Sequence, residues 1–433
     1  MILNFRWLLR VRPIALFVAA LAIWSCAPNP PIQGQPPQEQ PLDAAPEVER
    51  DPFDLAIERA LEAWTLTQAA RSPEDWDLVA RTWIDAVALM QSVPPGDPKR
   101  AFAQKKVIEY LRNAAYAISR ASEADVGFSY PTLNSPLLDE KLVLYQSYVR
   151  ALGPADILIV GSSRAAQGID PQMMQYVLGT QGYGGLKVFN FGIHGATAQV
   201  VDFLVRDLLP PEQLPKLILW VDGVRAFNSG REDRTYQEIV SSPGYQYLQN
   251  AKGLESRATL LASANAMAEV ADLDPPLAAE LLQGAIDLSA NLVDANGFVA
   301  VSESFDPKTY YQVYPYVPGA FDRDYAAFNL GGVQATATES LAAYARARQI
   351  PLVVVNLPLT PDYLDGVRYQ YEEEFRFYMQ QLASTQGFFW RDLYGQGLDR
   401  YDYFQDPSHL NAAGAAAVAR QIASDTSIPW PRR

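Results

Sequence analysis

Cysteine, histidine and basic residues are all scarce in this chain. Its 433 residues include a single cysteine, which excludes a disulfide bond within the chain. Two histidines leave only two positions for an imidazole base. Acidic residues outnumber basic ones by 49 to 35, and the net charge of −14 would repel the phosphates of a nucleic acid. We therefore expect no nucleic-acid partner.

The N-terminal region has an apolar run, but one too short to cross a membrane. Three arginines, Arg6, Arg10 and Arg12, precede this run, which covers residues 14–24. A helix that spans a bilayer needs about 20 apolar residues. A basic segment followed by a short apolar segment and a small residue is typical of an export signal. We predict a signal peptide over residues 1–26.

The predicted signal ends at Cys26, the one cysteine of the chain. The stretch AIWSC resembles the bacterial lipoprotein cleavage box, in which the cysteine becomes the lipidated first residue. Two acyl chains hold a protein stably on a membrane. We expect an exported protein of the bacterial cell envelope (periplasm), lipid-anchored to a membrane through Cys26; a plain secretory signal or an uncleaved anchor is the alternative. Residues 27–52, dense in Pro and Gln, predict an extended linker.

Residues 53–121 show helical periodicity in three stretches. Apolar side chains recur there every three or four residues, as at Phe53, Ile57, Leu61 and Trp64. Three amphipathic helices with short connections predict a small N-terminal helical bundle. Its Trp and Tyr residues belong to the bundle core or, as the alternative, form a groove for a protein partner.

From about residue 137 helical stretches alternate with short apolar runs. These runs cover residues 157–160, 186–192, 214–223, 350–360 and 387–393. Nearly continuous apolar strands between helices predict a mostly parallel sheet with both faces covered. We expect a three-layer α/β/α domain over residues 137–430. An insertion at about 224–333, rich in Tyr and Phe, is long enough to form a cap.

The first of these apolar runs ends in two serines. In the stretch ADILIVGSSRAAQGIDP, Ser162 and Ser163 follow the strand, at the edge where α/β sheets place ligands and nucleophiles. A serine needs an adjacent base, and the base needs an orienting carboxylate. Asp406 and His409 lie three residues apart on the loop after the last predicted strand and can supply both. The serines could otherwise be ordinary turn residues, and Asp406 could merely cap its loop.

Three motifs together resemble the SGNH (GDSL-like) hydrolase superfamily. They are GSSR after the first strand, FNFGIHGAT after the second, and DPSHLNAAG before the last helix. The resemblance covers residues 150–425 outside the insertion and implies an SGNH-like fold. It implies that Ser163 is the nucleophile, that Asp406 and His409 are its acid and base, and that Gly195 supplies an oxyanion-hole N–H.

The third motif of that family, Gly-x-Asn-Asp, is altered in this chain. The sequence here is VDGVRAFNSG, with Val224 near the Asn position and Arg225 and Asn228 just beyond it. We expect Asn228 to act as the third oxyanion donor, with Arg225 as the alternative or as an ion-pair partner of Asp222. Losing one such donor costs about 3 kcal/mol of transition-state stabilisation. The remaining candidates for the pocket are Ser162, Arg164, Asn190, His194 and Arg225.

These features predict an exported serine acyl hydrolase or O-acyltransferase. Its substrate would be an acetyl or acyl ester of a cell-envelope glycan or lipid, and its acceptor either water or a sugar hydroxyl. No cofactor and no metal ion is implied. The alternative is a non-catalytic envelope lipoprotein with a degenerate SGNH domain that binds a polysaccharide or a protein. The altered third motif favours this alternative, whereas the paired Asp406 and His409 oppose it.

Overall fold

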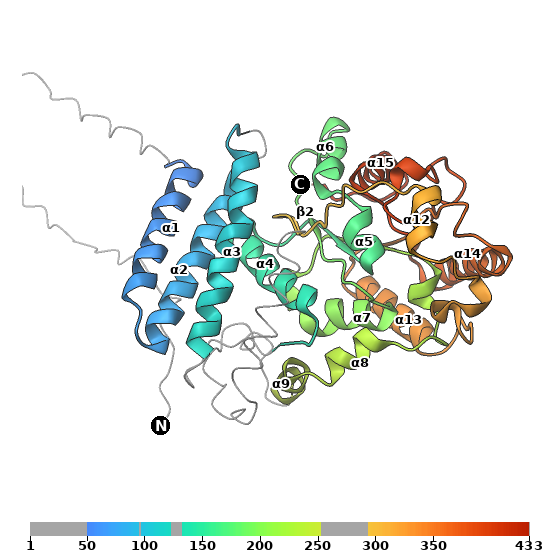
Figure 1. Cartoon of the computed structure of the whole chain (residues 1–433), viewed down its shortest axis with the longest axis horizontal. Helices are drawn as coiled ribbons and strands as arrows, with labels where there is room; N and C mark the ends of the chain where they lie inside the picture. Colours follow the sequence, from blue (N-terminus) through green and yellow to red (C-terminus); the bar gives the residue numbers. More distant parts are fainter. Residues whose placement is uncertain (1–49, 95–96, 123–131, 253–292, 433) are drawn as a thin grey trace, which may run out of the picture. The chain divides into compact units, whose positions relative to one another are not determined.

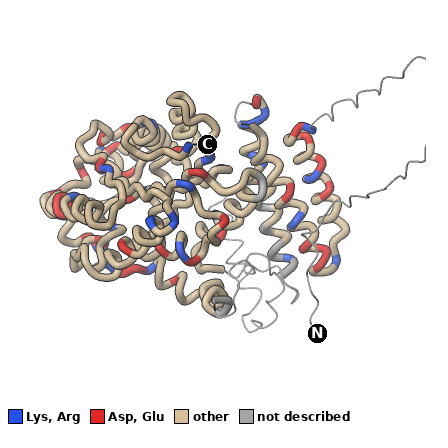
Figure 2. Tube along the Cα trace, turned by 180° about the vertical axis from the view of Figure 1, so that it is seen from behind, with Lys and Arg blue, Asp and Glu red and all other residues tan. Residues whose placement is uncertain are grey.

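The structure is a computed structural model that describes residues 50–94, 97–122, 132–252 and 293–432 (Figure 1). The predicted signal peptide, Cys26 and nearly all of the predicted linker lie outside these ranges. Within them, no helix combines the length and the apolar character that crossing a membrane requires. Acidic and basic residues are mixed along the described trace (Figure 2).

The three helical stretches of the N-terminal region form α1 (Pro52–Ala69), α2 (Pro73–Ser92) and α3 (Arg100–Ser122). The start of α2 is fixed by a capping box, in which Ser72 and Asp75 each accept a backbone N–H of the other. Helix α2 packs against α1, α3 and α4 (Pro136–Leu152). One continuous buried core joins these helices to a face of the sheet, and residues 50–433 form a single compact unit.

Five parallel strands form one sheet, in the order β2-β1-β3-β4-β5. They are β1 (Ile157–Val160), β2 (Val188–Asn190), β3 (Leu217–Asp222), β4 (Leu352–Asn356) and β5 (Phe389–Asp392). Each strand lies inside one of the apolar runs, and every residue of the first four is buried. The prediction of an α/β fold with a parallel sheet is confirmed.

Helices cover both faces of the sheet. Alternate residues of β1 point to opposite sides, so that Leu158 and Val160 belong to one core and Ile157 and Ile159 to the other. The first core is closed by α4, α7 (Ala198–Phe203), α13 (Val333–Ala347) and α14 (Gly366–Gln386). The second is closed by α6 (Pro171–Thr180) and α15 (Ala412–Ala423).

The described parts of the predicted insertion contain short helices. They are η3 (Val224–Phe227), α8 (Arg234–Val240), α9 (Pro243–Lys252), α12 (Pro307–Val313), η4 (Gly319–Phe321) and η5 (Arg323–Tyr325). Its 301–305 segment runs beside the loop that precedes α15. The Phe305 N–H donates to the Phe404 carbonyl at 2.7 Å, and the Ala412 N–H donates to the Val301 carbonyl at 2.7 Å. The insertion therefore supports the loop that carries Asp406 and His409.

Candidate active site

A sharp turn places Ser163 at the carboxyl edge of the sheet. Gly161 follows β1 with a φ of +140°, and a Cβ there would lie 2.1 Å from the Val221 carbonyl oxygen of the neighbouring strand. Only glycine lets the chain turn this close to β3. Ser162 then caps the short helix α5 (Ser163–Gly168) by accepting the Arg164 N–H, which leaves Ser163 as its first residue.

The structure brings Ser163, His409 and Asp406 together. The Ser163 Oγ lies 2.8 Å from the His409 Nε2, and the His409 Nδ1 lies 2.8 Å from the Asp406 Oδ2. The other carboxylate oxygen of Asp406 accepts the backbone N–H groups of Ser408 and His409 at 2.8 and 2.9 Å. The loop thus fixes the carboxylate, and the carboxylate in turn orients the imidazole. This is the geometry of a nucleophile, a base and an orienting acid.

Asp406 remains ionised in this arrangement. Burial alone would raise the pKa of Asp406, but the hydrogen bond and charge of His409 and the two backbone N–H groups together lower it to about 2. An ionised carboxylate selects the imidazole tautomer that carries its proton on Nδ1. The Nε2 lone pair then faces the Ser163 hydroxyl and can accept its proton.

Two backbone N–H groups, one in the serine turn and one in the loop bonded to that turn, are candidates for the oxyanion hole. Gly195 lies at φ +72° in a turn closed by the bond from the Ala196 N–H to the Ile193 carbonyl. This loop lies against the serine turn, because the Ile193 N–H donates to the Gly161 carbonyl at 2.8 Å. Within the described residues, neither the Ser163 N–H nor the Gly195 N–H donates a hydrogen bond to another protein group. Both are therefore free to bind an oxyanion.

Asn228 does not belong to this site, which corrects the expectation that it is the third oxyanion donor. Its side-chain amide is fully buried and donates to the carbonyls of Asp324 and Ala326 at 2.9 and 3.2 Å. Its Oδ1 accepts the N–H groups of Gly230 and Asn329 at 3.0 and 2.9 Å. Both N–H donors and both acceptor positions of the amide are therefore occupied, and these bonds connect segments of the insertion. Spacing along the sequence could not show these long-range partners.

Asn228→Ala is accordingly expected to lower stability rather than turnover. The change removes the four hydrogen bonds that the buried amide makes to backbone groups, which should reduce the free energy of unfolding by about 3 kcal/mol. Chemical denaturation followed by circular dichroism measures the loss. Ester turnover per folded molecule should stay within about threefold of wild type; a loss near the 10²-fold typical of an oxyanion donor would reinstate Asn228 in the site.

Arg225, the other residue of the altered third motif, contacts the triad loop. Its Nη2 donates to the Ser408 Oγ at 3.3 Å, and that oxygen lies 3.3 Å from the His409 Nδ1. Its Nη1 lies 3.5 Å from the Asp324 carboxylate, and its guanidinium lies 5.5 Å from the centre of the Tyr363 ring. Arg225 therefore approaches the triad from the Nδ1 side of the imidazole, away from Ser163.

Asp222, which we expected to pair with Arg225, instead binds the serine turn. Its Oδ2 accepts the Ser162 N–H at 2.8 Å, and its Oδ1 accepts the Ser162 hydroxyl at 2.9 Å and the Gly223 N–H at 3.0 Å. Burial raises the pKa of Asp222, while Arg164 and these hydrogen bonds oppose that shift. Sequence reasoning missed this role, although a carboxylate ending the apolar run LILWVD was a visible signal.

Two of the expected pocket residues are structural. Arg164 is buried, and its Nη2 donates to the carbonyls of Leu357 and Pro358 at 2.9 and 3.0 Å. Asn190 is fully buried, and its Nδ2 donates to the carbonyls of Ala165 and Ile169 at 2.8 and 3.0 Å. Both side chains tie α5 to neighbouring loops.

His194 directly precedes Gly195, and although part of the residue is exposed, protein atoms surround much of its ring. Loss of hydration and then the charges of Lys141 and His409 lower the pKa of His194 to about 4, so the ring is neutral at physiological pH. No carboxylate is bonded to it in the part of the chain that the structure describes. An oriented base is therefore found at His409 and not at His194.

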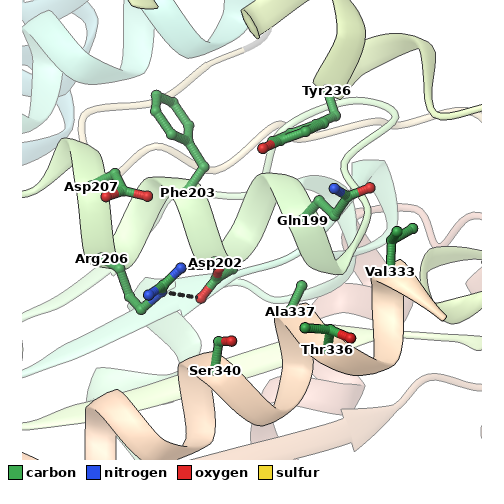
Figure 3. A pocket seen from close by; sticks show the side chains of 10 residues that line it. All are labelled: Gln199, Asp202, Phe203, Arg206, Asp207, Tyr236, Val333, Thr336, Ala337 and Ser340. Carbon is green, nitrogen blue, oxygen red and sulfur yellow. Dashed lines mark hydrogen bonds and ion pairs between the residues drawn. The ribbon is translucent and has the colours of Figure 1, made fainter. Parts of the chain in front are cut away.

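A separate cavity of about 260 Å³ lies between α7, the π-helical turn η1 (Leu204–Leu208), α8 and α13 (Figure 3). Its lining includes an ion pair between Arg206 and Asp202 at 2.5 Å, one helical turn apart on the same wall. None of the triad residues lines it. The two charges of this pair balance each other. Neither side chain of the pair is therefore left to bind an ionic ligand.

No family model matches the chain, and no curated protein matches it either. Among the described residues, no group of three or more His, Cys, Asp or Glu side chains is placed to hold a metal ion. The assignment of a function therefore depends on the geometry of the site itself.

Proposed function

We propose that this chain is an SGNH-type serine acyl hydrolase or O-acyltransferase that acts on ester groups of a cell-envelope glycan or lipid. The observation that carries the proposal is the pair of 2.8 Å hydrogen bonds that link Ser163 to His409 and His409 to Asp406. These residues come from opposite ends of the α/β part of the chain, so their convergence is a property of the fold. An ordinary turn serine has no need of an oriented imidazole.

The geometry supports acyl transfer in two steps. His409 Nε2 takes the hydroxyl proton as the Ser163 Oγ attacks the ester carbonyl, and Asp406 stabilises the imidazolium that forms. The backbone N–H groups of Ser163 and Gly195 bind the oxyanion. His409 then protonates the departing alcohol and leaves an acyl-serine. Water or a sugar hydroxyl, deprotonated by the same imidazole, then attacks the acyl-serine carbonyl, and His409 returns this proton to the Ser163 Oγ as its bond to the acyl group breaks.

The altered third motif leaves the site with two oxyanion donors instead of three. Both are backbone N–H groups, and the side-chain donor is missing. Arg225 does not replace the missing side-chain donor, since its contacts are with Ser408 and Asp324. Its contribution is to hold the loop that carries the triad acid and base. We therefore expect a slower enzyme than one with a complete oxyanion hole.

The rival proposal is a non-catalytic module, which the altered third motif favours. Both are tested by incubating the purified chain with nitrophenyl acetate and with a serine-reactive fluorophosphonate. Turnover together with one covalent adduct per chain supports an enzyme. If the folded chain shows neither with any acyl ester, the binding module is the better account.

The cell-envelope location is a proposal that rests on the N-terminal sequence. Cys26→Ser removes the thiol that lipidation requires, and we expect it to release the protein from membranes or to block its maturation. Membrane fractionation and electrophoretic mobility in a bacterial host measure the change. If the variant fractionates and migrates like wild type, Cys26 is not lipidated.

A further inference from the structure

Lys141 is a buried cation that the proposed chemistry does not use. It lies on α4 with no exposed surface, and its Nζ donates to the Gly192 carbonyl at 2.5 Å. Among the described residues no carboxylate lies within ion-pair distance of the ammonium; Glu140 and Asp294 act on it only at longer range. Burial lowers the pKa of Lys141 to about 7.

An ammonium in this position lowers stability. Removing a charge from water without a paired counter-charge costs free energy. An apolar side chain of the same length would fill the space at a smaller free-energy cost. Buried groups of this kind are concentrated at functional sites. The bond from Lys141 to Gly192 is therefore a candidate for a functional role.

Gly192 begins the loop that contains Gly195. The carbonyl that accepts the Lys141 ammonium belongs to the same peptide group as the Ile193 N–H, which donates to the Gly161 carbonyl at 2.8 Å. A charged donor on the oxygen of a peptide group polarises that group and strengthens the bond made by its N–H. Lys141 thereby tightens the contact between the Gly195 loop and the serine turn.

The chain of bonds continues on the other side of that contact. The Gly161 carbonyl and the Ser162 N–H share one peptide group, and this N–H donates to the Asp222 carboxylate at 2.8 Å. Two peptide groups therefore lie in series between the Lys141 ammonium and a buried carboxylate. One carries the loop of Gly195 and the other carries the turn of Ser163, which are the sources of the two oxyanion donors.

We propose that Lys141 is a positioning residue for the reaction. Lys141 and Asp222 are the side-chain ends of a hydrogen-bonded chain that fixes the two backbone donors of the oxyanion hole relative to each other. The inference rests on the proposed function and adds to it a residue from outside the sequence motifs. Lys141 touches neither the substrate nor the reacting atoms.

Lys141→Met in the full-length chain tests this role. We expect kcat for nitrophenyl acetate to fall about 10²-fold, the usual effect of misplacing a catalytic group by about 1 Å, while KM changes less than about threefold. The rate is divided by the number of sites that fluorophosphonate labels exhaustively, so that unfolded molecules do not count. A purely structural lysine would reduce the number of sites and leave the rate per site unchanged.

Lys187→Met is the matched control. Lys187 also donates to a backbone carbonyl of α4, that of Leu152 at 2.7 Å, but this bond does not join the chain described above. The control should keep the wild-type rate per site. A wild-type rate in Lys141→Met, or an equal loss in both variants, would overturn the inference.

Lys141→Gln keeps a donor but removes the charge, and we expect it to lower kcat about tenfold because neutral hydrogen bonds are weaker. If Lys141→Met does not fold, Lys141→Gln tests the proposal in its place. A wild-type rate per site in Lys141→Gln would then count against the proposal. If neither variant folds, Lys141 is a folding residue and the inference is wrong. Failure of the proposed function is a distinct result, since wild type itself would then show neither labelling nor turnover.

Discussion

Ser163→Ala is expected to abolish fluorophosphonate labelling and to lower ester turnover by on the order of 10⁶-fold, the loss seen when a triad serine is removed. The Ser163 Oγ lies 2.8 Å from the His409 Nε2, and alanine leaves that base with nothing to deprotonate. Initial rates with nitrophenyl acetate and the yield of the covalent adduct measure the effect. The melting temperature should hardly change, because Ser163 is at the first position of a short helix.

Ser162→Ala is the control for the neighbouring serine. Its hydroxyl caps α5 and donates to Asp222, so we expect a loss of about 1 kcal/mol in stability. Labelling should persist in this variant, at a reduced rate. If the adduct depends on Ser162 and not on Ser163, then Ser162 is the nucleophile and the assignment of Ser163 is wrong by one residue.

Asp406→Asn is expected to lower kcat about 10⁴-fold without unfolding the domain. An amide can donate to the His409 Nδ1, which selects the tautomer with its proton on Nε2. That tautomer cannot accept the serine proton. Steady-state kinetics measure the loss, and Asp402→Asn is the control. Asp402 is exposed nearby, pairs with Arg400 and should be silent when changed.

The low pKa of Asp406 fixes the direction of two pH effects. The carboxylate stays ionised down to about pH 2, so protonation of Asp406 does not reduce activity above that pH. Because the folded pKa lies below its ordinary value near 3.9, Asp406 stabilises the fold above that pH. This contribution, about 2 kcal/mol, is lost as the pH falls through 2. Asp406→Asn should therefore destabilise the protein at pH 7 more than at pH 2, as measured by urea denaturation.

The strands and the proposed triad could be predicted because their signals are local. Each strand is a run of apolar residues between helical stretches. Asp406 and His409 lie three residues apart, so that one loop sets their geometry. The end of a buried strand at Gly161 pointed to Ser162 and Ser163, and the resemblance of GSSR to the first family motif selected Ser163. These features need no knowledge of which distant segments meet.

Residues whose partners lie far along the chain could not be placed from the sequence. Asn228 is bonded to a segment about 100 residues away, and Asp222 to one 60 residues away. Lys141 contacts a loop 51 residues ahead of it. In each case the residue type is compatible with several partners. Which partner it binds depends on the segments that the fold brings together. The sequence therefore led to a wrong role for Asn228 at the third motif.

The most direct test of the account is to locate the fluorophosphonate adduct by peptide mass spectrometry of the labelled wild-type chain. We predict one adduct per chain, on the Ser163 hydroxyl. An adduct on any other residue, or a folded chain that takes up no label at all, would contradict it.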